Sequence, residues 1–282
     1  MWLRLVRKAK NLYKYQQFTV KNNKQVVRLI EPFFFEPNFA FVGFILKQLY
    51  SMNIKPLQID IVSDVACPWC YIGKKHLEKA LESFDSQPVE ITWHPYQLDP
   101  TIPTEGVSRD EYFAKKFGNI DQIEQIFQRV SGVGEKAGIV FNFDKMTKAV
   151  NTIPLHKMLH IAREEGTQIE LEERFFKAYF TDGIDFSDTE QLIAFMENFG
   201  WNREKTESVL ANEEITYHVS QEIKHFQGLG VRGVPFFILN NKYGISGAQP
   251  ISVFLETLNT VAAEMQPVEA FGDVCDVDGT DC

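Results

Sequence analysis

Cys67-Pro68-Trp69-Cys70 lies between a strand-like run, Leu57-Gln58-Ile59-Asp60-Ile61-Val62, and a helix-like run from Tyr71 to Phe84. A helix N-terminus carries unpaired N–H groups and a partial positive charge, which stabilise a thiolate placed there. A proline suits the first turn of such a helix. The order strand, paired cysteines and helix therefore predicts a thiol–disulfide active site. Cys67 is expected to be the nucleophile and Cys70, one turn further, the resolving thiol, with Pro68 and Trp69 setting the shape and electrostatics of the pair.

Two other interpretations of the cysteine pair stay open. The first is one half of a zinc site, but zinc prefers four ligands and usually two such pairs. The remaining cysteines, Cys275 and Cys282, have an unsuitable spacing at the far end of the chain. The second is a pair of inert buried thiols. The strand–helix setting favours redox chemistry and no metal.

Composition describes an ordinary globular protein. The chain has 282 residues, of which 44% are hydrophobic and 24% charged, enough for one large domain or two small ones. Four cysteines are too few for a disulfide-built scaffold. The net charge of −9 argues against nucleic acid as a partner.

Residues 1–51 differ in character from the rest of the chain. They hold nine basic residues against two acidic ones, and their apolar run Phe39–Leu46 is too short to span a bilayer. They do not match a secretory signal, because the basic region is long and no small-residue cleavage site follows. Regular patterning begins only after Met52. We therefore expect residues 1–51 to be a non-core basic extension or a non-native reading of the frame, with a peripheral membrane anchor as the alternative.

From Met52 onward, periodicity and turn residues predict two strands, a long helical stretch, a hairpin and a closing helix. The expected order is strand 57–63, helix 70–84, strand 89–96, helices over 108–224, strand 235–239, turn Asn240-Asn241, strand 242–246 and helix 250–263. The prediction is an α/β thioredoxin-like fold with a large all-helical domain inserted in its middle. Its parts are residues 52–104 and 225–264 (thioredoxin-like), 105–224 (helical insertion) and 265–282 (acidic tail).

Pro235 opens a core strand directly after Gly233-Val234. Proline cannot donate a hydrogen bond to a neighbouring strand, but the first position of a strand tolerates it. One interpretation is therefore an ordinary trans proline at the first residue of the strand. The functional interpretation is a cis Val234–Pro235 bond packed against the cysteine pair, which would expose the Val234 backbone as a docking edge for an extended substrate.

Five motifs of the chain belong together: Ser63-Asp64-x-x-Cys67-Pro68-Trp69-Cys70-Tyr71-Ile72-Gly73, Asn151-Thr152-x-x-x-His156, Phe176-Lys177-Ala178-Tyr179-Phe180, Gly233-Val234-Pro235-Phe236-Phe237 and Gly247-Ala248-Gln249-Pro250. As a set they resemble the FrnE-like branch of the DsbA family. The resemblance covers residues 57–263 and departs at Leu155, where relatives usually carry Ala. It implies a thioredoxin fold with a helical insertion, dithiol/disulfide oxidoreductase activity and a cytoplasmic setting.

Three classes of function are consistent with these features. A dithiol oxidoreductase needs both Cys67 and Cys70 and acts on protein, peptide or small-molecule thiols and disulfides. A glutathione-dependent isomerase or transferase of the same superfamily, whose members generally carry Ser in place of the first Cys, would tolerate loss of Cys70. A peptide-binding chaperone would tolerate loss of both. No cofactor is expected beyond glutathione as a co-substrate, and the sequence is compatible with a monomer or a homodimer.

The remaining reactive side chains are assigned to supporting roles. His156 and His160 stand four residues apart on one helix, but no further ligand completes a metal motif, which favours a structural role. His94 ends a strand. Cys275 and Cys282 are expected to form a local auxiliary disulfide that exchanges with the Cys67–Cys70 pair; closing so short a loop adds little stability.

Overall fold

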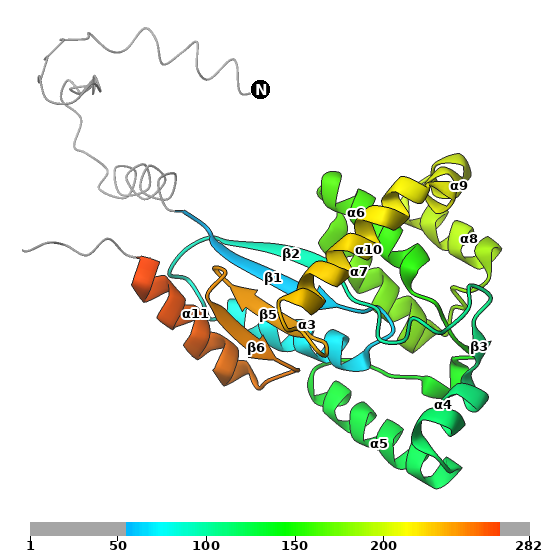
Figure 1. The fold of residues 1–282 in the computed structure, drawn as a ribbon. Coiled ribbons are helices and arrows are strands. Elements are labelled where there is room, and N and C mark those ends of the chain that lie inside the picture. The colour runs from blue at the N-terminus through cyan, green and yellow to red at the C-terminus, as the bar shows by residue number, and fades with distance from the viewer. Residues whose placement is uncertain (1–54, 266–282) are drawn as a thin grey trace, which may run out of the picture. The chain divides into compact units, whose positions relative to one another are not determined.

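The structure is a computed structural model that describes residues 55–265 (Figure 1). The predictions for residues 1–51 and for Cys275 and Cys282 fall outside these residues. Within the described range no helix is long and apolar enough to cross a membrane.

A four-stranded sheet forms the centre, in the order β2-β1-β5-β6. Strand β1 (Leu57–Ser63) runs parallel to β2 (Val89–Pro95) and antiparallel to β5 (Phe236–Leu239), which pairs with β6 (Tyr243–Ser246). The parallel β1–β2 pair requires a crossover, and helix α3 (Pro68–Leu81) provides it. Two strands from each end of the described chain therefore meet in one sheet.

Alternation along β1 decides which face of the sheet each side chain covers. Ile59 and Ile61 belong to the main core, whereas Val62 belongs to a separate small cluster with Tyr96 and Phe226. Helices α3 and α11 (Ile251–Met265) contact each other, and α10 (Glu213–Gly228) contacts β2. The sheet thus has buried residues on both faces.

The inserted segment is largely helical, as predicted. Its helices are α4 (Arg109–Phe117), α5 (Ile120–Lys136), α6 (Ile153–Glu164), α7 (Gln168–Lys177), α8 (Thr189–Phe199) and α9 (Arg203–Ala211), with a 3-10 turn η1 (Phe143–Lys145) and a π-helical turn η2 (Ala178–Asp182). Asparagine or aspartate side chains cap the N-termini of α5, α8, α9 and α10. Such caps satisfy free N–H groups, which explains the observed starting points.

Several predicted boundaries need correction. Helix α3 ends at Leu81 rather than residue 84, and α10 continues to Gly228, past the expected end of the insertion at residue 224. The insertion is also not purely helical, because β3 (Val107–Ser108) pairs with β4 (Lys148–Ala149). Strands of two residues are too short to leave a periodic pattern.

Buried polar contacts join the insertion to the sheet. The Gln168 amide of α7 pairs with the Trp93 backbone of β2, accepting from its N–H at 3.0 Å and donating to its carbonyl at 2.9 Å. Glu222 of α10 contacts His94 Nδ1 at 2.5 Å, while His94 Nε2 is 2.7 Å from Asp60 of β1. The edge strand β2 is therefore covered by side chains that continue its hydrogen bonding.

The predicted hairpin and cis peptide bond are both confirmed. Asn240 and Asn241 have positive φ values of 49° and 55°, a conformation that asparagine tolerates better than most residues. The Val234–Pro235 bond is cis. A Cβ added at Gly73 of α3 would stand 3.0 Å from ring atoms of both Pro235 and Phe237, a tighter contact than most side chains make, so this glycine helps the helix to lie close to Pro235 and β5.

Candidate active site

Cys67 occupies the N-cap of α3. Its backbone is extended, Pro68 is the first helical residue, and the first turn holds no acidic side chain. The Cys67 carbonyl accepts the N–H of Cys70 at 3.0 Å. The local sequence therefore places Cys67 at the positive end of the helix dipole, as the motif predicted.

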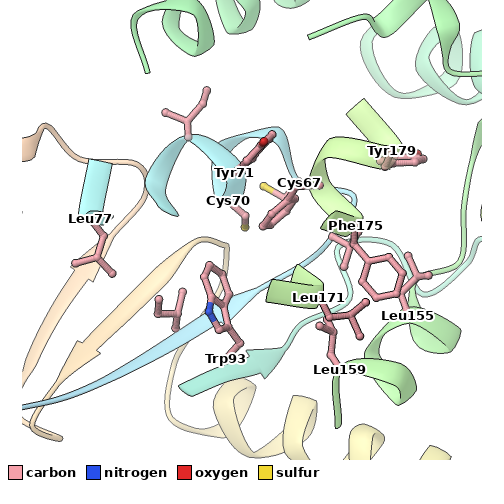
Figure 2. Close-up of a cluster of buried hydrophobic side chains, with 14 of the residues drawn as sticks. Cys67, Cys70, Tyr71, Leu77, Trp93, Leu155, Leu159, Leu171, Phe175 and Tyr179 are labelled. Atoms are coloured by element: carbon pink, nitrogen blue, oxygen red, sulfur yellow. The ribbon is translucent and has the colours of Figure 1, made fainter. Parts of the chain in front are cut away.

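The loop that precedes β5 lies against this thiol. Cys67 Sγ donates to the Val234 carbonyl at 3.6 Å, and the cis Pro235 follows directly. Figure 2 shows Cys67 and Cys70 at the start of α3 among the surrounding buried side chains. Residues 167 positions apart thus meet at one point.

The two cysteines are free thiols in unequal environments. Cys67 is 4% exposed and borders a cavity, whereas Cys70 is 0% exposed. Burial raises the pKa of Cys70 well above its ordinary value, and the neighbouring Cys67 raises it further, while the Ser63 hydroxyl acts in the opposite direction. This asymmetry matches the assignment of Cys67 as the thiol that meets the substrate.

A buried carboxyl group lies next to Ser63, the last residue of β1. The Ser63 hydroxyl donates to Glu172 Oε1 at 3.2 Å, and Glu172 is 1% exposed. Within residues 55–265 its Oε2 has no hydrogen-bond partner. Burial raises the pKa of Glu172 to about 7. The carboxyl can therefore exchange a proton near neutrality, beside a Ser63 hydroxyl that also influences the pKa of Cys70.

A second polar group fixes the loop that follows β1. Asp64 accepts the N–H of Ala66 at 3.2 Å and that of Leu98 at 2.7 Å, and His156 Nε2 lies 3.6 Å from its carboxylate. Burial alone would lower the pKa of His156, but its bond to Asp64 raises it overall. His156 also contacts the Tyr96 carbonyl at 2.8 Å. Its role is to join α6 to the active-site loop, which agrees with the predicted structural function.

A cavity of about 260 Å³ opens beside Cys67, between the start of α3 and helices α4 and α5. Most of its lining is apolar and aromatic, drawn from Trp69, Phe113, Phe127, Phe143, Phe180 and Val234 among others. Their convergence on Cys67 is a product of the insertion's packing.

Potential metal ligands do not converge in the described part of the chain: residues 55–265 contain no group of three or more His, Cys, Asp or Glu placed to hold an ion. His160 instead stacks on His218, with ring centroids 6.1 Å apart, and lies 3.3 Å from the Arg163 guanidinium. Nor does His94 approach the cysteines; it is held between Asp60 and Glu222.

Sequence reasoning missed Glu172 and Thr152 as site residues. Glu172 lies on α7, 109 positions from its partner Ser63. Thr152 is 2% exposed and lines the cavity, and its hydroxyl has no partner within the described residues. The only signal in the sequence was the Asn151-Thr152-x-x-x-His156 motif, which gave no indication of what it contacts.

The fold and this constellation define a thioredoxin-type dithiol protein with a helical insertion. A family profile, described as the DsbA-like thioredoxin domain, matches residues 58–259. The chain therefore belongs to the DsbA-like thioredoxin family, whose members are thiol–disulfide oxidoreductases.

Individual relatives agree with this placement. The chain is similar to the crystal structure of a probable DsbA oxidoreductase from Streptomyces coelicolor, with a TM-score of 0.70 and 30% identity, covering 80% of this chain and 99% of that one. It is 26% identical to the uncharacterized protein YwbO of Bacillus subtilis over 204 residues, or 72% of this chain and 96% of YwbO. The cytosolic disulfide reductase DsbM of Pseudomonas aeruginosa, solved with GSH, shares the fold at a TM-score of 0.51 and 16% identity, covering 74% of this chain and 96% of DsbM.

Proposed function

We propose that this protein is a dithiol/disulfide oxidoreductase that works through Cys67 and Cys70. The observation that carries the proposal is the asymmetry of the pair. Cys67 caps the helix and borders a cavity, while Cys70 is wholly buried one turn further along. A thiol that meets the substrate and a protected thiol that resolves the intermediate are the two parts that thiol–disulfide exchange requires.

The exchange runs in two steps. The Cys67 thiolate attacks one sulfur of a substrate disulfide, forming a mixed disulfide and releasing the first substrate thiolate. The Cys70 thiol then loses its proton, for which the buried Ser63–Glu172 pair is the proposed acceptor, and its sulfur attacks Cys67 Sγ. The second substrate thiolate leaves, and the protein retains the Cys67–Cys70 disulfide. In sum, the protein dithiol loses two electrons and the substrate disulfide gains them; the reverse direction oxidises a substrate dithiol.

Placement in the FrnE-like branch and a cytoplasmic setting form part of this proposal. The relative DsbM is described as a cytosolic disulfide reductase, which supports both a reducing compartment and a soluble thiol as the electron source. Glutathione is the corresponding candidate co-substrate, because DsbM was solved with GSH.

The test is a single turnover of the reduced protein with bis(hydroxyethyl) disulfide, followed by peptide mapping. The wild type should release two equivalents of thiol and carry a Cys67–Cys70 disulfide. Cys70→Ser should stop at a mixed disulfide on Cys67 after one equivalent, and Cys67→Ser should not react at this site. A Cys70→Ser variant that turns over normally with glutathione would instead indicate the glutathione-dependent isomerase or transferase. Reaction at neither cysteine contradicts the proposal and leaves the chaperone.

A further inference from the structure

The cavity beside Cys67 is small and partly open to the surface. Its volume of about 260 Å³ falls slightly below the usual range for small-molecule sites, roughly 300–1,000 Å³, and it exceeds the ~150 Å³ cavity that holds one benzene ring. One or two rings fit; a folded domain does not. Since Cys67 is only 4% exposed and borders this space, a reacting sulfur has to enter the cavity to reach it.

The charged side chains that border the cavity are already paired within the protein. Asp64 accepts two backbone N–H groups and faces His156. Asp99 accepts from the hydroxyl of Thr101 at 2.6 Å, and Lys116 donates to the Tyr112 hydroxyl at 2.7 Å. Two carboxylates and one ammonium give no surplus of positive charge. With two carboxylates against one ammonium, this lining favours an uncharged disulfide over oxidised glutathione, whose several carboxylates would be costly to bury.

One polar group in the lining is left without a partner. The Thr152 hydroxyl is buried, and nothing within residues 55–265 bonds to it. The Thr152 side chain has to rotate for its covered hydroxyl to face the cavity, and a ligand with a hydrogen-bonding atom then recovers the free energy that an unsatisfied buried hydroxyl costs. The remaining wall is apolar and largely aromatic, which favours a flat apolar body stacked among the phenylalanine rings.

We propose that the substrate of Cys67 is a low-molecular-weight, uncharged disulfide with an aromatic or similarly apolar body and one hydrogen-bonding atom that reaches Thr152. This inference rests on the proposed function and narrows its substrate class. The chemistry is the same: the Cys67 thiolate displaces one arene thiolate, Cys70 displaces the second, and the protein dithiol becomes a disulfide as two molecules of thiol are released. No further reductant is needed for one turnover.

The experiment compares single-turnover rates of the reduced full-length protein with two neutral probes, dipyridyl disulfide and bis(hydroxyethyl) disulfide. Each rate is divided by that of dithiothreitol with the same probe, which removes differences in intrinsic reactivity. The protein should favour the aromatic probe by at least about tenfold, because burying one ring is a gain of that order. Its rate should saturate with probe concentration. The normalised rates with oxidised glutathione, which is an anionic disulfide, and with insulin, which is a protein disulfide, should not show this increase.

Matched variants separate the cavity from the chemistry. Ile126→Trp places extra volume in the lining, whereas Arg129→Trp puts the same side chain on an exposed position of the same helix, α5. Thr152→Val removes the unpaired hydroxyl and keeps the shape. Ile126→Trp should abolish the aromatic preference, Thr152→Val should reduce it, and Arg129→Trp should retain it. Arg129→Trp should also keep the wild-type rate with bis(hydroxyethyl) disulfide, and an unchanged melting temperature should show that the fold of all three variants is intact.

Two results would overturn the inference while leaving the oxidoreductase function standing. One is a rate with dipyridyl disulfide that does not saturate and is unchanged in Ile126→Trp and Thr152→Val. The other is a normalised rate with oxidised glutathione or insulin that equals or exceeds the aromatic one. Failure of the wild type to react with bis(hydroxyethyl) disulfide would instead contradict the proposed function itself.

Discussion

Glu172→Gln should make the protein more stable at neutral and alkaline pH. The carboxyl is 1% exposed, Oε1 accepts from Ser63, and Oε2 has no partner among the described residues. Glutamine keeps an acceptor for Ser63 and has nearly the same volume, but it cannot ionise. The substitution therefore isolates the cost of burying a charge at this position.

The magnitude follows from the pKa. Burial raises the pKa of Glu172 from an ordinary 4.5 to about 7, and each unit corresponds to ~1.4 kcal/mol, so the full penalty is roughly 3 kcal/mol. Between these two values the folded state holds a proton that the unfolded state has lost. The free energy of unfolding therefore falls as pH rises from about 4.5 to about 7, and the whole penalty is present above pH 7.

The assay is urea unfolding of the reduced proteins between pH 5.5 and 8.5. The difference in unfolding free energy between Glu172→Gln and wild type should grow across this range and level off near ~3 kcal/mol. Glu173→Gln is the control, because its expected effect on the free energy of unfolding has the opposite sign. Burial alone would raise the pKa of Glu173, but its bonds to Lys74 and Lys75 lower it overall, so this variant should be less stable than wild type at neutral pH. If the free energy of unfolding changed with pH in the same way for Glu172→Gln and wild type, Glu172 would not be the group that titrates, and the predicted penalty would be refuted.

Three further expectations concern packing and the two ends of the chain. Gly73→Ala should destabilise the protein by about 1–3 kcal/mol through overpacking. Gly132→Ala, whose added Cβ would meet nothing within 4 Å, should stabilise it by about 0.5–1 kcal/mol. Equal shifts of the melting temperature in the two variants would contradict the close approach of α3 to Pro235 and Phe237. A chain that begins at Met52 should melt cooperatively and keep its thiol activity, and misfolding would place residues 1–51 in the core. Cys275→Ser/Cys282→Ser should slow recycling of the active site, and an unchanged redox state of that site in cells would exclude a relay.

The local part of the active site was predictable from the sequence alone. The cysteine spacing after a strand indicated Cys67 at a helix N-terminus, and Pro235 before an apolar run marked the start of β5. These features depend on neighbours within a few residues, so propensity and spacing determine them. The same holds for the Asn240-Asn241 hairpin, where asparagine tolerates the required φ values.

The chemical surroundings of the thiols were decided by the tertiary structure. Glu172 looks like one of several acids on an amphipathic helix, and Thr152 like an ordinary residue before a helix. Only packing of the insertion against the sheet brings the first to Ser63 and the second to the cavity wall. Periodicity shows which face of a helix is buried, but not which distant polar group it meets. Burial therefore sets the pKa of Glu172 and the character of the cavity, because both depend on the exclusion of water by residues remote in the chain.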